Sequence, residues 1–151
     1  MPYPQNATFN YNSSDAVQVE SSLILNIDSA TCNDTCKSFL NNNFKDIITD
    51  QIIKKEKVTD FRVSLHEPID LPRHSYKILG TIYRVQLSFI EDSLEKIYPK
   101  LEIGIDESYT LNINETLIYI KATTVYGAKY AFETLNQLIR INNENKKCII
   151  I

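Results

Sequence analysis

The sequence predicts an α+β domain in which two helices pack on one face of an antiparallel β-sheet. Several segments carry apolar residues at every second position, which indicates strands, and two carry them at every third or fourth position, which indicates helices. The length of 151 residues is that of one domain, and no internal repeat divides it. We therefore expect an extended arm over residues 1–15 and a single α+β domain over residues 16–151.

The first half of the chain contains a predicted strand and a predicted helix. Apolar and polar residues alternate from Ala16 to Ile27, which is typical of a strand. Residues 33–35 supply helix-capping side chains, and an amphipathic helix is expected over about 35–53. Its apolar face consists of Cys36, Leu40, Phe44, Ile47, Ile48 and Ile52.

The middle of the chain alternates between strand and loop patterns. A short strand is expected at 61–65, followed by a loop at 68–75 that contains two prolines. A further strand is predicted over 82–90, with one face formed by Tyr83, Val85, Leu87 and Phe89. Residues 109–113 and 116–121 are expected to form a hairpin around a two-residue turn at Asn114 and Glu115.

A second amphipathic helix follows, capped by Thr123 or Thr124 and continuing to about Ile141. The apolar stripe expected to face the sheet consists of Val125, Ala128, Phe132, Leu135 and Ile139. The flank expected to point away from the sheet consists of Tyr126, Tyr130, Glu133 and Gln137. Residues 148–151 have the pattern of the beginning of a strand.

Composition argues against several functions. The net charge of −3 disfavours a nucleic-acid partner, which would require a basic face. No apolar run reaches the roughly 18 residues of a membrane span, and no signal peptide is expected in the sequence as given. The sequence contains no glycine-rich phosphate loop and no nucleophile elbow, so we expect no bound cofactor.

Two residue patterns resemble zinc-binding motifs, but neither of them predicts a metal site. His66 and Glu67 begin like the motif H-E-x-x-H, but Asp70 replaces the second histidine and Pro68 prevents the required helix. A Cys₂His₂ set would need two histidines that lie eight residues apart beside prolines. That set consists of Cys32, Cys36, His66 and His74. We therefore expect no metal ligand in this chain.

The cysteines and the N-glycosylation sequons are candidate sites of covalent modification. In an oxidising compartment, Cys32 is expected to pair with either Cys36 or Cys148, which leaves one thiol free. N-x-[ST] sequons, which are a weak indication of secretion, begin at Asn6, Asn12, Asn33 and Asn114.

Residues 107–139 carry a resemblance to a known family. They contain a Y-x-L-x-I strand at 109–113, then Y-G-A at 126–128 and E-T-x-x-Q-L at 133–138. This order of motifs resembles the end of the N-terminal domain of family 20 glycoside hydrolases, the β-N-acetylhexosaminidases of eukaryotic lysosomal type. Residues 2–5 and 36–45 resemble the beginning of that domain more loosely.

The resemblance implies a zincin-like accessory domain that lacks metal ligands. In the family, a catalytic (β/α)₈ barrel follows this domain and removes terminal N-acetylhexosamines from glycoconjugates, using an adjacent Asp-Glu pair. That barrel is absent from this chain, so the resemblance implies no catalytic residue here and no activity of the chain alone. The cysteine pairing of the animal enzymes is not carried over, because residues 91–93 contain no cysteine.

The resemblance also implies a role and a set of partners. The parent enzyme is expected to be a lysosomal or secreted glycoprotein, and the domain is expected to support the barrel of the same polypeptide. A second hexosaminidase subunit is a further candidate partner. Tyr126 and Tyr130 are the residues expected to face the barrel. The alternative interpretation is a stand-alone interaction or glycan-binding module without catalysis.

Overall fold

The computed structural model describes residues 15–28, 30–52, 77–141 and 146–150. The predicted strand at 61–65, the loop at 68–75 and both histidines lie outside these residues, as does nearly all of the predicted arm. In chain order, the elements are β1 (Asp15–Ile27), α1 (Asp34–Phe44), η1 (Lys45–Thr49), β2 (Lys77–Phe89), α3 (Leu94–Ile97), β3 (Tyr109–Ile113), β4 (Ile118–Ala122), α4 (Val125–Leu138), β5 (Arg140–Ile141) and β6 (Lys147–Ile150).

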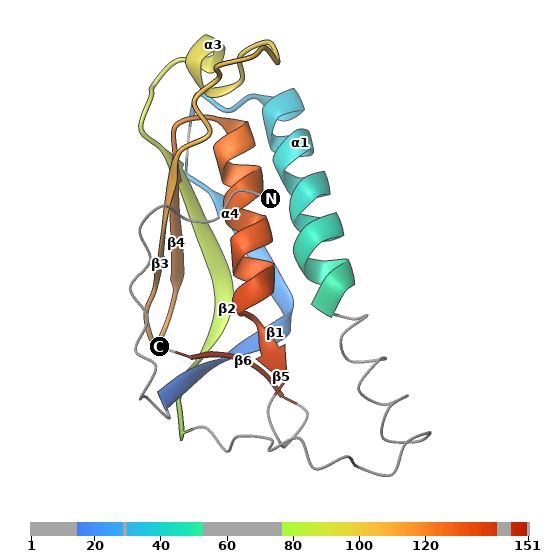
Figure 1. Ribbon diagram of the computed structural model, residues 1–151, viewed down its shortest axis with the longest axis vertical. Coiled ribbons are helices and arrows are strands. Elements are labelled where there is room, and N and C mark those ends of the chain that lie inside the picture. Colours follow the sequence, from blue (N-terminus) through green and yellow to red (C-terminus); the bar gives the residue numbers. More distant parts are fainter. Residues whose placement is uncertain (1–14, 29, 53–76, 142–145, 151) are drawn as a thin grey trace.

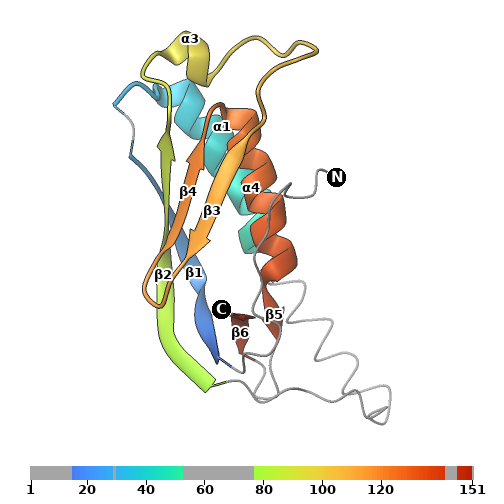
Figure 2. The ribbon, with the colours of Figure 1, turned by 60° about the vertical axis from the view of Figure 1, so that its left-hand side comes forward.

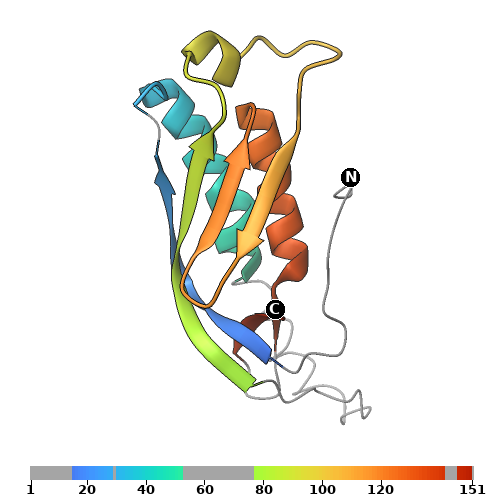
Figure 3. The same ribbon diagram turned by 90° about the vertical axis from the view of Figure 1, so that its left-hand side faces the viewer.

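The six strands form one sheet in the order β3-β4-β2-β1-β6-β5, and α1 and α4 lie side by side on one of its faces (Figures 1 and 3). The predicted α+β class and the single helix layer are therefore confirmed. The sheet is mixed rather than antiparallel, because β1 is parallel to β2 and β2 is parallel to β4. Parallel neighbours need a crossover connection, and α1 lies in the connection between β1 and β2.

The first helix forms where the sequence predicts it. Asn33 is the N-cap, and its side-chain oxygen accepts a hydrogen bond of 2.9 Å from the backbone nitrogen of Cys36. The helix continues beyond Phe44 through the π-helical turn η1, and helical residues extend to Ile52. The ring of Phe44 meets that of Phe132 edge-on at 5.3 Å, which joins α1 to α4.

Strand β2 differs from its prediction at Tyr83. The expected face placed Tyr83 with Val85 and Leu87, but Tyr83 is 61% exposed whereas Ile82 is fully buried. The cause is a register shift in the pairing with β1, where Val19 lies opposite Ile82 but Ile24 lies opposite Arg84. Alternation of faces is interrupted at such a bulge, so Tyr83 does not share the buried face of Val85.

The connection between β3 and β4 is also longer than predicted. It covers residues 114–117, not the two residues 114–115. The side-chain oxygen of Asn114 accepts hydrogen bonds from the backbone nitrogens of Thr116 and Leu117, at 2.9 and 2.8 Å. An asparagine side chain that bonds the following backbone stabilises a turn in this way, so Asn114 is the turn-forming residue.

Helix α4 packs against β3 and β4, at one edge of the sheet. Thr124 is its N-cap, and α4 ends at Leu138 rather than near Ile141 because the chain continues into β5. The predicted apolar stripe is buried in the core at all five positions. The strand expected over 148–151 is β6, which begins at Lys147. Among the described residues, no helix is both long enough and apolar enough to cross a bilayer.

Candidate functional site

The side of the helix layer that faces away from the sheet is the candidate site. On α4, Tyr130 and Glu133 are half-buried and Gln137 is exposed. These three residues lie outside the buried stripe, as the sequence predicts. On the neighbouring helical segment, Phe39 and Ile47 are partly buried against the core. The surface is therefore partly apolar and partly polar.

Tyr126, the fourth residue of the predicted flank, is partly buried and makes contacts within the domain. Its hydroxyl donates a 3.0 Å hydrogen bond to the carbonyl oxygen of Pro99. Its ring meets Phe39 edge-on at 5.8 Å and Tyr98 at 6.2 Å. Helix α3 and the residues after it lie near the end at which α4 begins (Figure 2), and Tyr98 and Pro99 contact Tyr126 from this segment.

These contacts change the chemistry of the phenol of Tyr126. Burial, together with a smaller electrostatic effect of Tyr98, raises the pKa of Tyr126 above its usual value. The phenol therefore stays protonated, and its O–H group donates the hydrogen bond to the carbonyl oxygen of Pro99. Tyr126 acts as a structural residue that fixes residues 98–99 against α4.

The N-terminal end of α4 holds a group of short polar contacts. The hydroxyl of Thr124 donates to the carbonyl oxygen of Asp106 at 2.7 Å and accepts from the backbone nitrogen of Gly127 at 3.3 Å. The hydroxyls of Ser108 and Thr123 lie 3.0 Å apart. Together, these contacts attach the segment before β3 to the first turn of α4.

Asp106 is also part of this group of polar contacts. Its carboxylate accepts a 2.8 Å hydrogen bond from the backbone nitrogen of Ser108. Hydrogen bonds from the side chain and backbone of Ser108 lower the pKa of Asp106. A catalytic acid would need the opposite shift, toward retention of its proton at neutral pH. Asp106 and Glu107 are both exposed.

Gly127 allows the close approach that this arrangement requires. A Cβ atom at this position would lie 2.7 Å from the carbonyl oxygen of Ser108 and 3.0 Å from that of Glu107. Such a separation is below van der Waals contact, so the glycine of the Y-G-A motif has a packing role here.

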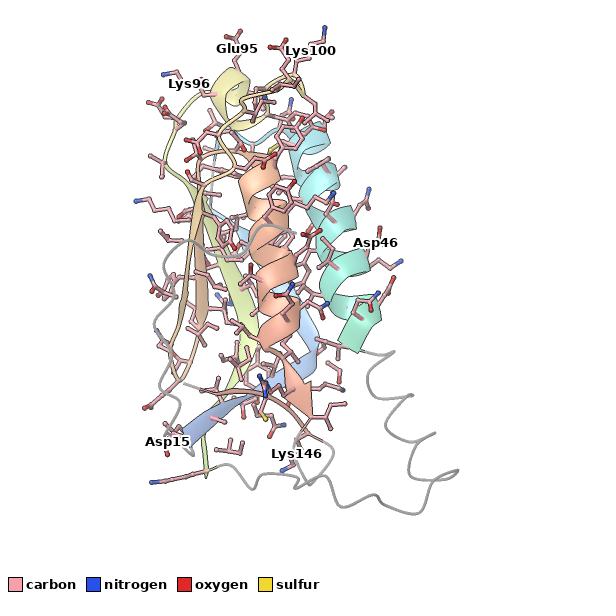
Figure 4. All side chains as sticks on the ribbon, viewed as in Figure 1. Asp15, Asp46, Glu95, Lys96, Lys100 and Lys146 are labelled. Carbon is pink, nitrogen blue, oxygen red and sulfur yellow. A yellow bond between two sulfur atoms is a disulfide. The ribbon has the colours of Figure 1, made fainter. Side chains whose placement is uncertain are left out.

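Several charged side chains near the helix layer are exposed. Glu95, Lys96 and Lys100 project into solvent near α3, and Asp46 projects outward from η1 (Figure 4). Lys96 forms a 3.5 Å ion pair with Glu91 in which the lysine side chain is mostly exposed. Ion pairs of this kind contribute little to stability, so we assign them no role in the site.

Two of the three cysteines form a disulfide. Of the two pairings that the sequence leaves open, the structure has the disulfide between Cys32 and Cys36, with their Cα atoms 5.3 Å apart. Cys148 is a buried free thiol in β6, and burial raises its pKa. Within the described part of the chain, no group of three or more potential ligands could hold a metal ion.

Two of the four sequons lie within the described residues, and both asparagines are exposed. Asn33 caps α1, and Asn114 forms the turn between β3 and β4. Asn6 and Asn12 lie outside the described residues.

Comparison with known proteins defines the class. A family model described as "beta-acetyl hexosaminidase like" matches residues 1–138. The chain therefore belongs to this family, and it corresponds to the N-terminal domain of family 20 glycoside hydrolases. The motifs at 107–139 therefore indicated the correct family and the correct domain of it.

Particular relatives support this assignment. The chain is 38% identical over 141 residues to a protein named beta-hexosaminidase subunit beta of Entamoeba histolytica, covering 93% of this chain and 25% of that protein. It is 47% identical over 51 residues to beta-hexosaminidase subunit A1 of Dictyostelium discoideum, covering 33% of this chain and 10% of that protein. This chain thus spans about a quarter of the length of the Entamoeba relative.

A solved structure shows the same fold. A chitobiase of Flavobacterium johnsoniae matches 99% of this chain and 19% of its own chain, with a TM-score of 0.55 and 20% identity. At this identity, the comparison supports the architecture alone.

Proposed function

We propose that this chain is the non-catalytic accessory domain of a β-N-acetylhexosaminidase, and that its role is to stabilise the catalytic domain that follows it. The observation that carries the proposal is the unequal coverage: the alignment includes 93% of this chain but only 25% of the Entamoeba relative. The catalytic barrel and its Asp-Glu pair would belong to the remaining part.

The described residues support a structural role. The adjacent acids Asp106 and Glu107 are exposed at the segment before β3, and the first of them serves in a turn. A glycosidase acid is normally held in an environment that raises its pKa, whereas the pKa of Asp106 is lowered. The polar contacts around Thr124 are likewise used to join segments of the domain.

The outer side of α4 is the surface that we propose contacts the catalytic domain. Tyr130 and Glu133 are half-buried and Gln137 is exposed, so an aromatic ring lies beside polar groups. Interfaces between domains of one chain are of this mixed character. Because Tyr126 already contacts Phe39, Tyr98 and Pro99 within the domain, Tyr130 is the residue of the predicted pair that we propose for this contact.

We also propose that the parent enzyme is lysosomal or secreted, with a second hexosaminidase subunit as a further partner. A disulfide between Cys32 and Cys36 supports an oxidising compartment, and the exposed sequons at Asn33 and Asn114 are compatible with it. Membrane and nucleic-acid partners form no part of the proposal.

An activity assay tests the proposal. The purified chain is expected to leave an aryl N-acetyl-β-glucosaminide unhydrolysed, whereas the longer protein that contains the proposed barrel should hydrolyse it. As a control, the Asp106→Asn variant of the longer protein should retain its activity. Turnover by the isolated chain that survives repurification and is lost on substitution of one of its residues would contradict the proposal. A gene that ends without a barrel would instead favour a stand-alone module.

A further inference from the structure

An N-glycosylation sequon lies entirely inside the disulfide loop at the beginning of α1. Asn33, Asp34 and Thr35 are exposed, and they are enclosed in the sequence by Cys32 and Cys36, which are 2% and 0% exposed. Every residue that defines the sequon therefore belongs to a five-residue ring closed by a sulfur–sulfur bond.

The closed ring fixes the backbone of the sequon. The Cα atoms of Cys32 and Cys36 are 5.3 Å apart, whereas an extended chain would separate them by roughly 13 Å. The backbone oxygen of Asn33 accepts a 2.8 Å hydrogen bond from the nitrogen of Lys37, and its side-chain oxygen accepts from Cys36. The sequon is thus folded back into the first turn of a helix.

N-glycosylation and disulfide closure make opposite demands on this segment. In the first reaction, Asn Nδ2 attacks C1 of a sugar on a lipid-diphosphate donor. The N–C1 bond forms, the C1–O bond to the diphosphate breaks, and Nδ2 loses one proton. The transferring enzyme must reach both the asparagine amide and the hydroxyl two residues later. A capped helical turn under a covalent link cannot be drawn into an enzyme's cleft.

Disulfide closure proceeds by thiol–disulfide exchange. The two cysteine thiols lose two electrons and two protons to the disulfide of a secretory-pathway oxidoreductase, which becomes a dithiol. Before this step, residues 32–36 are restrained by noncovalent contacts, which include the backbone hydrogen bond to Lys37 and the side-chain cap of Asn33, and such contacts open readily at a helix end.

We propose that closure of the Cys32–Cys36 disulfide ends the glycosylation of Asn33, so that the glycan is attached only while both cysteines are thiols. This inference rests on the secretory route proposed above. A glycosylated chain still closes its disulfide and caps α1, because the cap uses Oδ1 of Asn33 and the exposed side chain leaves Nδ2 outside that hydrogen bond.

Asn114 supplies an internal comparison. It is exposed at the turn between β3 and β4, and its Oδ1 accepts a 3.0 Å hydrogen bond from the hydroxyl of Thr116, the other sequon residue. The disulfide of the described residues lies in another part of the chain. The redox state of Cys32 and Cys36 should therefore leave the glycosylation of Asn114 unchanged.

The test supplies this chain with a cleavable signal sequence, expresses it in eukaryotic cells, and measures occupancy of both asparagines by glycopeptide mass spectrometry. In the double variant Cys32→Ser and Cys36→Ser, occupancy of Asn33 should rise several-fold while that of Asn114 stays constant. The Cys148→Ser variant removes a cysteine that lies outside the ring, and it should behave as the wild type does.

A second measurement keeps the test valid if the double variant fails to fold. The unmodified chain is translated into microsomes with increasing dithiothreitol, and occupancy of Asn33 should increase with the reductant. Occupancy of Asn33 that ignores the cysteines, that changes in step with Asn114, or that is zero in every form would overturn the inference. Because the signal sequence is supplied, failure of the proposed natural route would not alter this result.

Discussion

The two long helices lie side by side but are stabilised in different ways. In α4, seven of 14 residues are buried, and the helix packs directly against β3 and β4. In α1, three of 11 residues are buried, and its main neighbour is α4. A disulfide and an asparagine cap fix the beginning of α1, whereas close backbone packing and a threonine cap fix the beginning of α4.

This difference indicates a division of roles. Helix α4 belongs to the hydrophobic core, so substitutions along its inner side should affect the whole domain. Helix α1 lies beside α4 with a smaller buried surface, and local restraints compensate for it. We expect changes to α4 to alter global stability and changes at the beginning of α1 to have smaller effects.

The largest expected effect tests the core side of α4. Phe132 of α4 is fully buried and its ring contacts Phe44 of α1, so Phe132→Ala removes contacts in the core and between the two helices. We expect a loss of about 3–5 kcal/mol in the free energy of unfolding, measured by urea denaturation. Tyr130→Ser, at a half-buried position of the same helix that lies outside the buried stripe, is the matched control and should change stability little. Equal effects of the two substitutions would contradict the assignment of faces.

The next effect tests the close packing at Gly127. Alanine normally favours a helix over glycine, but here its Cβ would lie 2.7 Å from the carbonyl oxygen of Ser108. We expect Gly127→Ala to lower stability by up to about 3 kcal/mol. Lys129→Ala, two residues later, provides the control for helix propensity. A more stable Gly127→Ala variant would show that the segment before β3 can move away at little cost.

Reduction of the disulfide should have a smaller effect. Opening a five-residue ring costs roughly 2 kcal/mol by the chain-entropy relation. The reduced chain should remain folded, with faster amide hydrogen exchange in α1 than in α4. Global unfolding on reduction would mean that α1 is as important to the core as α4.

The smallest effect concerns pH. Because the pKa of Asp106 is lowered in the folded chain, its contribution to stability is present above the unfolded pKa and is lost as pH falls through the folded pKa. Asp106 is exposed, so the contribution should be well below about 1 kcal/mol. Asp106→Asn should therefore reduce the acid dependence of stability between about pH 5 and pH 2. An unchanged acid dependence would contradict this interpretation.

The periodicity of apolar residues and the capping residues predicted much of this fold. Periodicity located both helices, and the capping residues at Asn33 and the 123–124 pair marked their beginnings. The sequence did not predict the parallel pairing of β1 with β2, because strand direction depends on the path of the connection. It also missed the bulge that exposes Tyr83, since a bulge arises from the pairing of two strands.

The candidate site was predicted less completely, and the reason lies in tertiary contacts. Helical spacing alone placed Tyr126 and Tyr130 on one flank, but it did not show that Tyr98 and Pro99 contact Tyr126 from a distant part of the sequence. The contacts of Thr124 with Asp106 were missed for the same reason. A cluster of short polar residues at 106–108, directly before a strand, was the signal available in the sequence.

The most direct test of the accessory role compares one substitution in two contexts. Tyr130→Ser should leave the melting temperature of the isolated chain nearly unchanged and should lower that of the longer protein. Tyr126→Ser, which removes contacts inside the domain, should lower the melting temperature in both. The accessory role of the domain is contradicted if Tyr130→Ser destabilises the isolated chain as much as the longer protein, or if it affects neither.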